Sequence, residues 1–187
     1  MILFYRIVLK IHNVLKSLYD KAYIEICKTK GLKLGKDVIL IEAPDFGSEP
    51  FLIEIGDRSK ITAGCRFINH DGAMYTIRSM EKFADARNFG RIRLGKNCFV
   101  GNNCTFLPGS QMGDNCILGA GSVLNSSIPD NSVYAGVPAK FICTIEEYGN
   151  KALKNNILYP RELEENRADL EKYIKEHLPH TYKPTKK

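Results

Sequence analysis

The sequence predicts an all-β fold, a solenoid of parallel strands with a helical segment at each end. Three observations support this prediction. Apolar residues recur at every sixth position from Leu94 to Leu124, this rhythm is lost and regained once earlier in the chain, and apolar residues near both termini follow helical spacing. The 187 residues fit one domain, and 44% of them are apolar, which is enough to bury a core.

Residues 1–32 are expected to form an amphipathic helix. Its apolar residues recur with the period of a helix and are Leu3, Phe4, Ile7, Val8, Ile11, Val14, Leu15, Leu18 and Ala22. Such a helix either covers the open first coil of the solenoid or makes peripheral contact with an anionic membrane. Covering is the preferred interpretation, because a terminal coil needs a cap.

Charge is distributed unevenly along the chain. Residues 1–36 contain eight basic and two acidic residues, which accounts for the whole net charge of +6 and leaves the rest neutral. A neutral folded body argues against nucleic-acid binding.

Arg6 and Lys10 interrupt the N-terminal apolar segment, and no small-residue cleavage site follows it, so neither a membrane span nor a signal peptide is expected. The expected location is the cytoplasm, including the inner face of the membrane.

Residues 33–143 are expected to form the solenoid. From Leu94 the chain reads as the blocks LGKNCF, VGNNCT, FLPGSQ, MGDNCI, LGAGSV and LNSSIP. A period of six fits short strands joined by tight corners, in which the first residue points inward, Gly or Asn supplies the turn, and the fifth place is small. Three faces close one coil in about 18 residues, so Cys98 and Cys116 are expected to stack on adjacent coils.

The cysteines follow the same rhythm. Four of the six occupy the small fifth place, namely Cys65, Cys98, Cys104 and Cys116. The chain contains neither a C-x-x-C pair nor a cluster of Cys and His. We therefore interpret these cysteines as small core residues, and no metal is expected.

The repeats and the closing segment, which includes Gly119–Leu124 and the sequence AGVPAK at Ala135–Lys140, resemble the hexapeptide-repeat acyltransferases over residues 34–145. The chain is most similar to the branch of sugar, capsule and antibiotic O-acetyltransferases, such as the maltose, galactoside and virginiamycin enzymes. The resemblance implies a left-handed parallel β-helix and a homotrimer with active sites between subunits. It also implies acetyl-coenzyme A as the acyl donor.

The rhythm breaks between residues 68 and 93, where a long excursion loop is expected, and long loops in compact domains are often functional. His70 stands at its start, in the sequence NHDG, which looks like the catalytic motif of the family. Imidazole suits the task of removing a proton from an attacking hydroxyl at neutral pH. His70 is therefore the expected general base. Asp71 is the second candidate catalytic residue, either orienting the imidazole or binding the acceptor, and a main-chain carbonyl is the alternative orienting group.

Four residues are assigned to acetyl-coenzyme A by the resemblance. Asn102 is placed near the thioester, Ala120 meets the pantetheine through its backbone, Asn125 lies further along, and Lys140 faces a phosphate. Each also has a purely structural interpretation, since Asn102 suits a left-handed corner and Lys140 suits a solvated surface.

Residues 144–187 are expected to form a helical extension with an apolar stripe of Leu163, Leu170, Ile174 and Leu178, followed by a solvated tail from Pro179.

The predicted function is acetyl-coenzyme A-dependent O-acetylation of a sugar hydroxyl on a saccharide or polysaccharide precursor, by direct transfer in a ternary complex. Two alternatives stay open: N-acetylation of an amino sugar or a nucleotide-linked amino sugar, and a non-catalytic binding scaffold.

Overall fold

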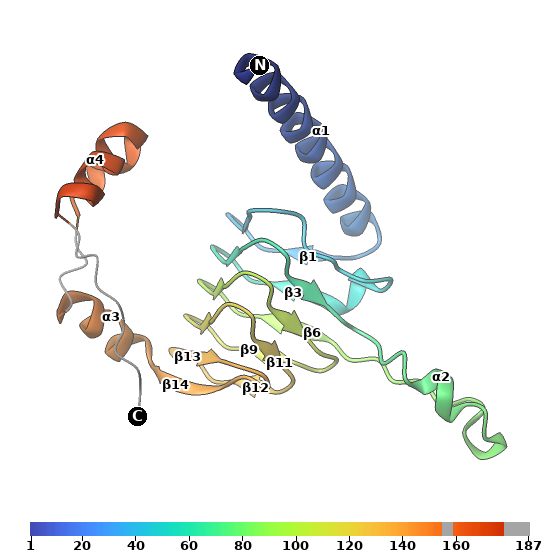
Figure 1. The fold of residues 1–187 in the computed structure, drawn as a ribbon. Helices are drawn as coiled ribbons and strands as arrows, with labels where there is room; N and C mark the ends of the chain where they lie inside the picture. Colours follow the sequence, from blue (N-terminus) through green and yellow to red (C-terminus); the bar gives the residue numbers. More distant parts are fainter. Residues whose placement is uncertain (155–158, 178–187) are drawn as a thin grey trace. The chain divides into compact units, whose positions relative to one another are not determined.

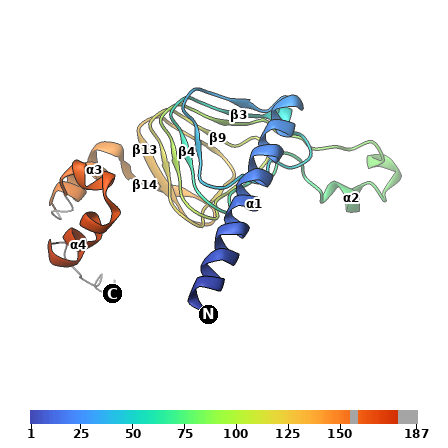
Figure 2. The same ribbon diagram turned by 90° about the horizontal axis from the view of Figure 1, so that it is seen from above.

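The computed structural model describes residues 1–154 and 159–177. Short strands wind into a prism with three faces (Figures 1 and 2). The first face contains β1 (Lys33–Leu34), β3 (Ile53–Ile55), β6 (Ile92–Leu94), β9 (Gln111–Met112) and β12 (Ser127–Ile128). The second contains β2 (Ile39–Leu40), β4 (Lys60–Ile61), β7 (Phe99–Val100), β10 (Ile117–Leu118), β13 (Ser132–Ala135) and β14 (Lys140–Thr144). The third contains β5 (Arg66–Phe67), β8 (Thr105–Phe106) and β11 (Val123–Leu124). Neighbouring strands are parallel, except that β14 runs antiparallel to β13.

The core is a stack of equivalent residues from successive coils. The first residues of the blocks from Leu94 to Leu124 are at most 1% exposed, and the fifth-place residues from Cys98 to Ser122 are at most 2% exposed. Phe67 and Phe106 stack with ring centroids 4.6 Å apart. The β7–β10 register places Cys98 above Cys116, as the period predicts. This layering removes the side chains of every coil from water, and the layers support one another.

Asparagines form the last three corners between the first and second faces, and Asp37 and Arg58 hold the equivalent place in the two earlier coils. Asn97, Asn115 and Asn131 all adopt positive φ angles, of 54°, 55° and 57°. Their side chains are linked in a ladder, with Nδ2 of Asn97 donating to Oδ1 of Asn115 at 2.9 Å and Nδ2 of Asn115 donating to Oδ1 of Asn131 at 3.0 Å. The left-handed conformation and the amide ladder together explain why asparagine occupies this place.

Replacing Asn115 with alanine is expected to lower the free energy of unfolding by about 1–2 kcal/mol, because alanine tolerates the left-handed conformation poorly and the two ladder hydrogen bonds are lost. Urea unfolding measures the change. Asn115→Gly, which keeps the conformational freedom, is the control and should cost less than Asn115→Ala. An alanine variant as stable as the wild type would contradict this account.

The N-terminal helix α1 (Ile2–Thr29) contacts the first coil through its second half, where Lys16 pairs with Glu42 at 3.4 Å. Tyr23 stacks on Phe46 and accepts a hydrogen bond from the Phe46 N–H at 3.0 Å, and Cys27 is buried. Residues 1–15 are exposed, and so are Leu18 and Ala22, the last two members of the predicted apolar stripe, so the stripe does not cover the coil as expected. A 28-residue helix is about 42 Å long, which is longer than a prism face of about six residues, so most of α1 extends beyond the coil (Figures 1 and 2). Among the described residues, no helix is both long enough and apolar enough to cross a membrane.

Residues 146–187 form a second compact unit. Its described elements are α3 (Ile145–Lys154), η3 (Arg161–Glu165) and α4 (Arg167–His177). Leu163, Leu170 and Ile174 lie in η3 and α4. Leu178 and the tail from Pro179, which we expected to be solvated, lie outside the described residues.

Candidate active site

Two insertions meet at one corner of the prism, between the third and first faces. Residues paired across β6 and β9 are 18 apart in sequence, such as Arg93 and Gln111. Lys33 and Glu54, paired across β1 and β3, are 21 apart, while Ile53 and Ile92, paired across β3 and β6, are 39 apart. The earlier coil therefore carries three extra residues around η1 (Pro50–Leu52), and the next carries the long excursion. Because these coils are neighbours, the two insertions lie against each other.

The excursion leaves the third face after β5 and returns at β6. It contains α2 (Met74–Ile77) and η2 (Glu81–Phe83), and it projects from the prism in both views (Figures 1 and 2). The two ends of the loop are held together by an antiparallel bridge between His70 and Phe89 and by a hydrogen bond of 2.9 Å from the Gly90 N–H to the Asn69 carbonyl. His70 thus lies on the rigid base of the loop.

The His70 imidazole has a carboxylate partner that the sequence did not suggest. Its Nδ1 lies 2.7 Å from Oε2 of Glu49, with the two side chains 43% and 20% exposed. An ionised carboxylate can only accept, so this contact places the imidazole proton on Nδ1 and leaves the lone pair of Nε2 available. The structure gives Nε2 no hydrogen-bond partner among the described residues. This is the arrangement that a general base requires.

Glu49 is itself held in place by Asn69, the residue that precedes the histidine. Asn69 is 1% exposed, and its Nδ2 donates to the Glu49 carbonyl at 2.8 Å and to the Phe46 carbonyl at 3.1 Å. The Ser48 hydroxyl donates to Oε2 of Glu49 at 3.0 Å. The buried amide therefore fixes the three-residue insertion against the base of the excursion.

Asp71 does not orient the histidine in this structure. Its Oδ1 accepts a hydrogen bond of 2.9 Å from the Ala73 N–H, which starts the turn into α2. Successive side chains in extended backbone point to opposite sides, and the turn after Asp71 uses its carboxylate locally. The expected orienting contact from Asp71, or from a main-chain carbonyl, is therefore replaced by the contact with Glu49.

A cavity of about 400 Å³ opens beside His70, and we call it the His70 pocket. It is lined by Ile68, His70, Asp71, Gly72, Asn88, Leu107, Pro108 and Asn125. Its volume lies in the range of small-molecule sites. The structure thus brings three of the predicted site residues together, namely His70, Asp71 and Asn125.

The other three predicted residues lie elsewhere on the prism. Asn102 and Ala120 belong to adjacent coils at the corner between the second and third faces, where the Gly121 N–H donates to the Asn102 carbonyl at 2.8 Å. The residue with the left-handed conformation at this corner is Asn103, with φ 58°, and not Asn102. Lys140 begins β14 and is exposed. A single chain therefore does not place these residues in the His70 pocket.

The cysteines offer no alternative nucleophile at this pocket. Cys65, Cys98, Cys104 and Cys116 are all at most 2% exposed. None of the four lines the His70 pocket, and burial keeps their thiols away from solvent and substrate. Among the described residues, no three His, Cys, Asp or Glu side chains gather in a way that could hold a metal ion.

A parallel β-helix of six-residue repeats is the architecture of one class of protein, the transferases built on hexapeptide repeats. The family model described as bacterial transferase hexapeptide (six repeats) matches residues 91–126. Protein CapG of Staphylococcus aureus is 42% identical over 127 residues, which are 67% of this chain and 73% of CapG. The chain belongs to the hexapeptide-repeat transferase family.

Two further proteins are similar to parts of the chain, one in sequence and one in fold. Galactoside O-acetyltransferase of Escherichia coli K12 is 41% identical over 56 residues, 30% of this chain and 28% of that enzyme. The structure of a maltose O-acetyltransferase from Clostridium difficile 630 superposes with a TM-score of 0.53 at 18% identity, covering 71% of this chain and 83% of that one. The predicted left-handed β-helix fold is confirmed, and so is the prediction of an acyltransferase: the chain is an acetyltransferase of this family.

Proposed function

We propose that the chain is an acetyl-coenzyme A-dependent O-acetyltransferase that modifies a hydroxyl of a saccharide or polysaccharide precursor. The observation that carries the proposal is the contact of 2.7 Å between Nδ1 of His70 and Oε2 of Glu49 at the His70 pocket. Galactoside O-acetyltransferase and maltose O-acetyltransferase, to which the chain is similar, act on sugars by name, which supports a saccharide acceptor.

His70 serves as the general base. Its Nε2 takes the proton of the acceptor hydroxyl while the hydroxyl oxygen forms a bond to the thioester carbonyl carbon. Glu49 stabilises the imidazolium that results, because its carboxylate accepts from Nδ1. When the carbon–sulfur bond breaks, the imidazolium returns the proton to the departing thiolate, so the histidine ends in its starting form. Acetyl transfer is direct, and no covalent enzyme intermediate is needed.

The donor is proposed to lie along Asn102, Ala120 and Lys140, and Asn125 is proposed to lie nearer the reacting groups because it lines the His70 pocket. In one chain the first three residues are at a different corner from His70. A homotrimer, in which one subunit supplies the histidine corner and its neighbour supplies the donor residues, accounts for this separation.

The proposal is tested by measuring thiol release from acetyl-coenzyme A with a panel of saccharides. Turnover that depends on a sugar hydroxyl, with an O-acetyl ester in the product, is the expected result. A wild-type protein that neither binds coenzyme A in calorimetry nor releases thiol with any acceptor would contradict it and favour a binding scaffold.

The exposed part of α1 is proposed to lie on an anionic membrane surface. The face of α1 that shares a cavity of about 290 Å³ with residues 40–43 is largely polar and includes Asn13, Lys16, Ser17 and Asp20. The opposite face is apolar, and residues 1–19 contain no acid. A wide apolar face beside basic residues suits an interfacial helix, and each basic residue near such a surface adds about 1 kcal/mol.

Full-length protein is therefore expected to co-sediment with vesicles that contain phosphatidylglycerol at low salt, and less so at high salt. The double variant Ile11→Glu, Leu15→Glu should lose this binding, because two charges enter the apolar face. Ile142→Glu, at an exposed apolar residue of β14, is the matched control and should bind like the wild type. Absence of wild-type binding at low salt would remove the membrane proposal.

A further inference from the structure

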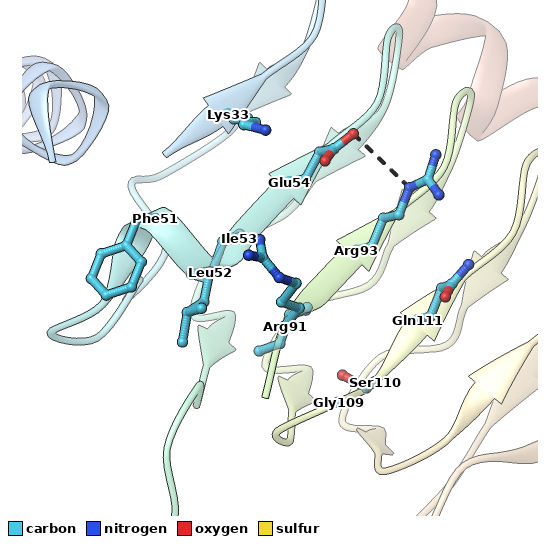
Figure 3. Close-up of a pocket in the computed structure, with 11 residues that line it drawn as sticks. Lys33, Phe51, Leu52, Ile53, Glu54, Arg91, Arg93, Gly109, Ser110 and Gln111 are labelled. Atoms are coloured by element: carbon cyan, nitrogen blue, oxygen red, sulfur yellow. Dashed lines mark ion pairs between the residues drawn. The ribbon is translucent and has the colours of Figure 1, made fainter. Parts of the chain in front are cut away.

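A second cavity, which we call the first-face cavity, lies on the other side of the corner that carries His70. It has a volume of about 170 Å³ and crosses four consecutive coils, from β1 to β9. Figure 3 shows the charged and polar side chains that border it, which are Lys33, Glu54, Arg91, Arg93 and Gln111. None of them belongs to the catalytic contact described above.

The border of the first-face cavity is positively charged. It has three cations and one acid. Nε of Arg93 lies 4.0 Å from Oε1 of Glu54, with both side chains at least half exposed, so this pair is weak. The side chains of Lys33 and Arg91 have no hydrogen-bond or ion-pair partner in the described part of the chain. In Figure 3 the Arg91 side chain reaches from the start of β6 toward Ile53 of β3, across the cavity. An unpaired guanidinium offers a planar fork of donors that matches a carboxylate or phosphate.

Consecutive residues of the chain border the first-face cavity and the His70 pocket. Gly90 hydrogen-bonds Asn69 beside His70, and Arg91 follows it directly. Pro108 lines the His70 pocket, and the next residue, Gly109, lines the first-face cavity. The two cavities therefore flank the base of the excursion, one on each side. An acceptor with its hydroxyl at His70 can therefore place a charged substituent past this base, in the first-face cavity.

We propose that the first-face cavity binds an oxyanion, a carboxylate or a phosphate, carried by the acceptor. The inference rests on the proposed function and narrows the acceptor to an anionic saccharide. The cavity is smaller than a site for a drug-sized ligand, so it accommodates one group and not a whole oligosaccharide. An anion of the acceptor differs from a phosphate of the donor in its kinetic effect, because loss of a donor contact would raise the KM for acetyl-coenzyme A.

The experiment compares three acceptors with the same ring: methyl glucoside, methyl glucuronide and glucose 1-phosphate. Thiol release is measured for the wild type, Arg91→Gln and Arg91→Lys, with Lys60→Ala, an exposed lysine of the second face, as the control. The wild type is expected to prefer one anionic acceptor, and which one distinguishes a carboxylate from a phosphate. Arg91→Gln should raise the KM for that acceptor roughly tenfold or more, Arg91→Lys less, and Lys60→Ala not at all. The KM for acetyl-coenzyme A should be unchanged in all three variants.

Equal efficiency of the wild type with neutral and anionic acceptors, or a raised KM for acetyl-coenzyme A in Arg91→Gln, would overturn the anion site and leave the proposed function standing. If no acceptor is turned over, the proposed function fails. Binding of an anion at the first-face cavity is then measured by calorimetric titration with methyl glucuronide and with glucose 1-phosphate. Binding of either one that weakens in Arg91→Gln supports the site. Binding of neither by the wild type overturns it.

Discussion

His70→Ala is expected to reduce the turnover of acetyl-coenzyme A with a saccharide acceptor by roughly 10²–10⁴-fold, because the acceptor hydroxyl then has no group positioned to take its proton. The loss should be confined to kcat. His70 is only partly buried, and no core residue depends on its side chain, so the free energy of unfolding should change little. Steady-state thiol release and urea unfolding, measured on the same preparation, separate the two effects.

The control for this variant is His12→Ala. His12 lies on the exposed part of α1, outside both cavities, and its removal should leave kcat and both KM values unchanged. The residual rate of His70→Ala comes from binding the two substrates together, which the variant retains. Wild-type turnover in a folded His70→Ala protein would exclude the histidine as the base.

The solenoid could be predicted because its period is carried by every coil. Leu94, Val100 and Phe106 occupy equivalent inward places, and the same physical demand repeats six residues later, so each block supports the assignment of the next. The position of His70 at the start of a loop could be predicted for the same reason. The six-residue repeat is regular on both sides of residues 68–93, so its loss between them marks the loop.

Glu49 could not be found in this way. It belongs to a coil of 21 residues, in which the segment from Ile41 to Phe51 carries no six-residue signal. Counting back one regular coil of 18 residues from His70 gives Leu52, whereas the spacing of 21 between paired residues gives Glu49. The signal that identifies the partner is therefore the register of β1 on β3, which is a property of the folded coil.

The orientation of α1 was likewise outside the reach of periodicity. The apolar spacing correctly indicated an amphipathic helix, but it could not show that only the second half of the helix contacts the coil. Tyr23 and Cys27, which make that contact, lie on a different face from the predicted stripe. A pattern identifies which residues share a face, and the neighbouring structure decides which face is used.

Glu49→Gln is expected to lower kcat roughly 10–100-fold while the KM values for acetyl-coenzyme A and for the acceptor stay within about twofold. Glutamine has the size of glutamate and can still accept from Nδ1, but it carries no charge to stabilise the imidazolium. It also presents an N–H₂ group that can turn toward Nδ1 and favour the wrong tautomer. Glu42→Gln, which removes a carboxylate that pairs with Lys16 at 3.4 Å, is the matched control and should retain wild-type kcat.

The double variant His70→Ala, Glu49→Gln shows whether Glu49 acts through the histidine. If the carboxylate only orients and stabilises the imidazole, its loss has nothing left to affect once the imidazole is gone, so the double variant should turn over at the rate of His70→Ala alone. A further drop of the same size as in the wild-type background would instead assign Glu49 a direct contact with a substrate.

Asn69→Ala adds a second test. Without the amide that holds the Glu49 carbonyl at 2.8 Å, kcat should fall in the wild type and stay level in a Glu49→Ala background, because Asn69 positions the carboxylate and takes no other part in the reaction.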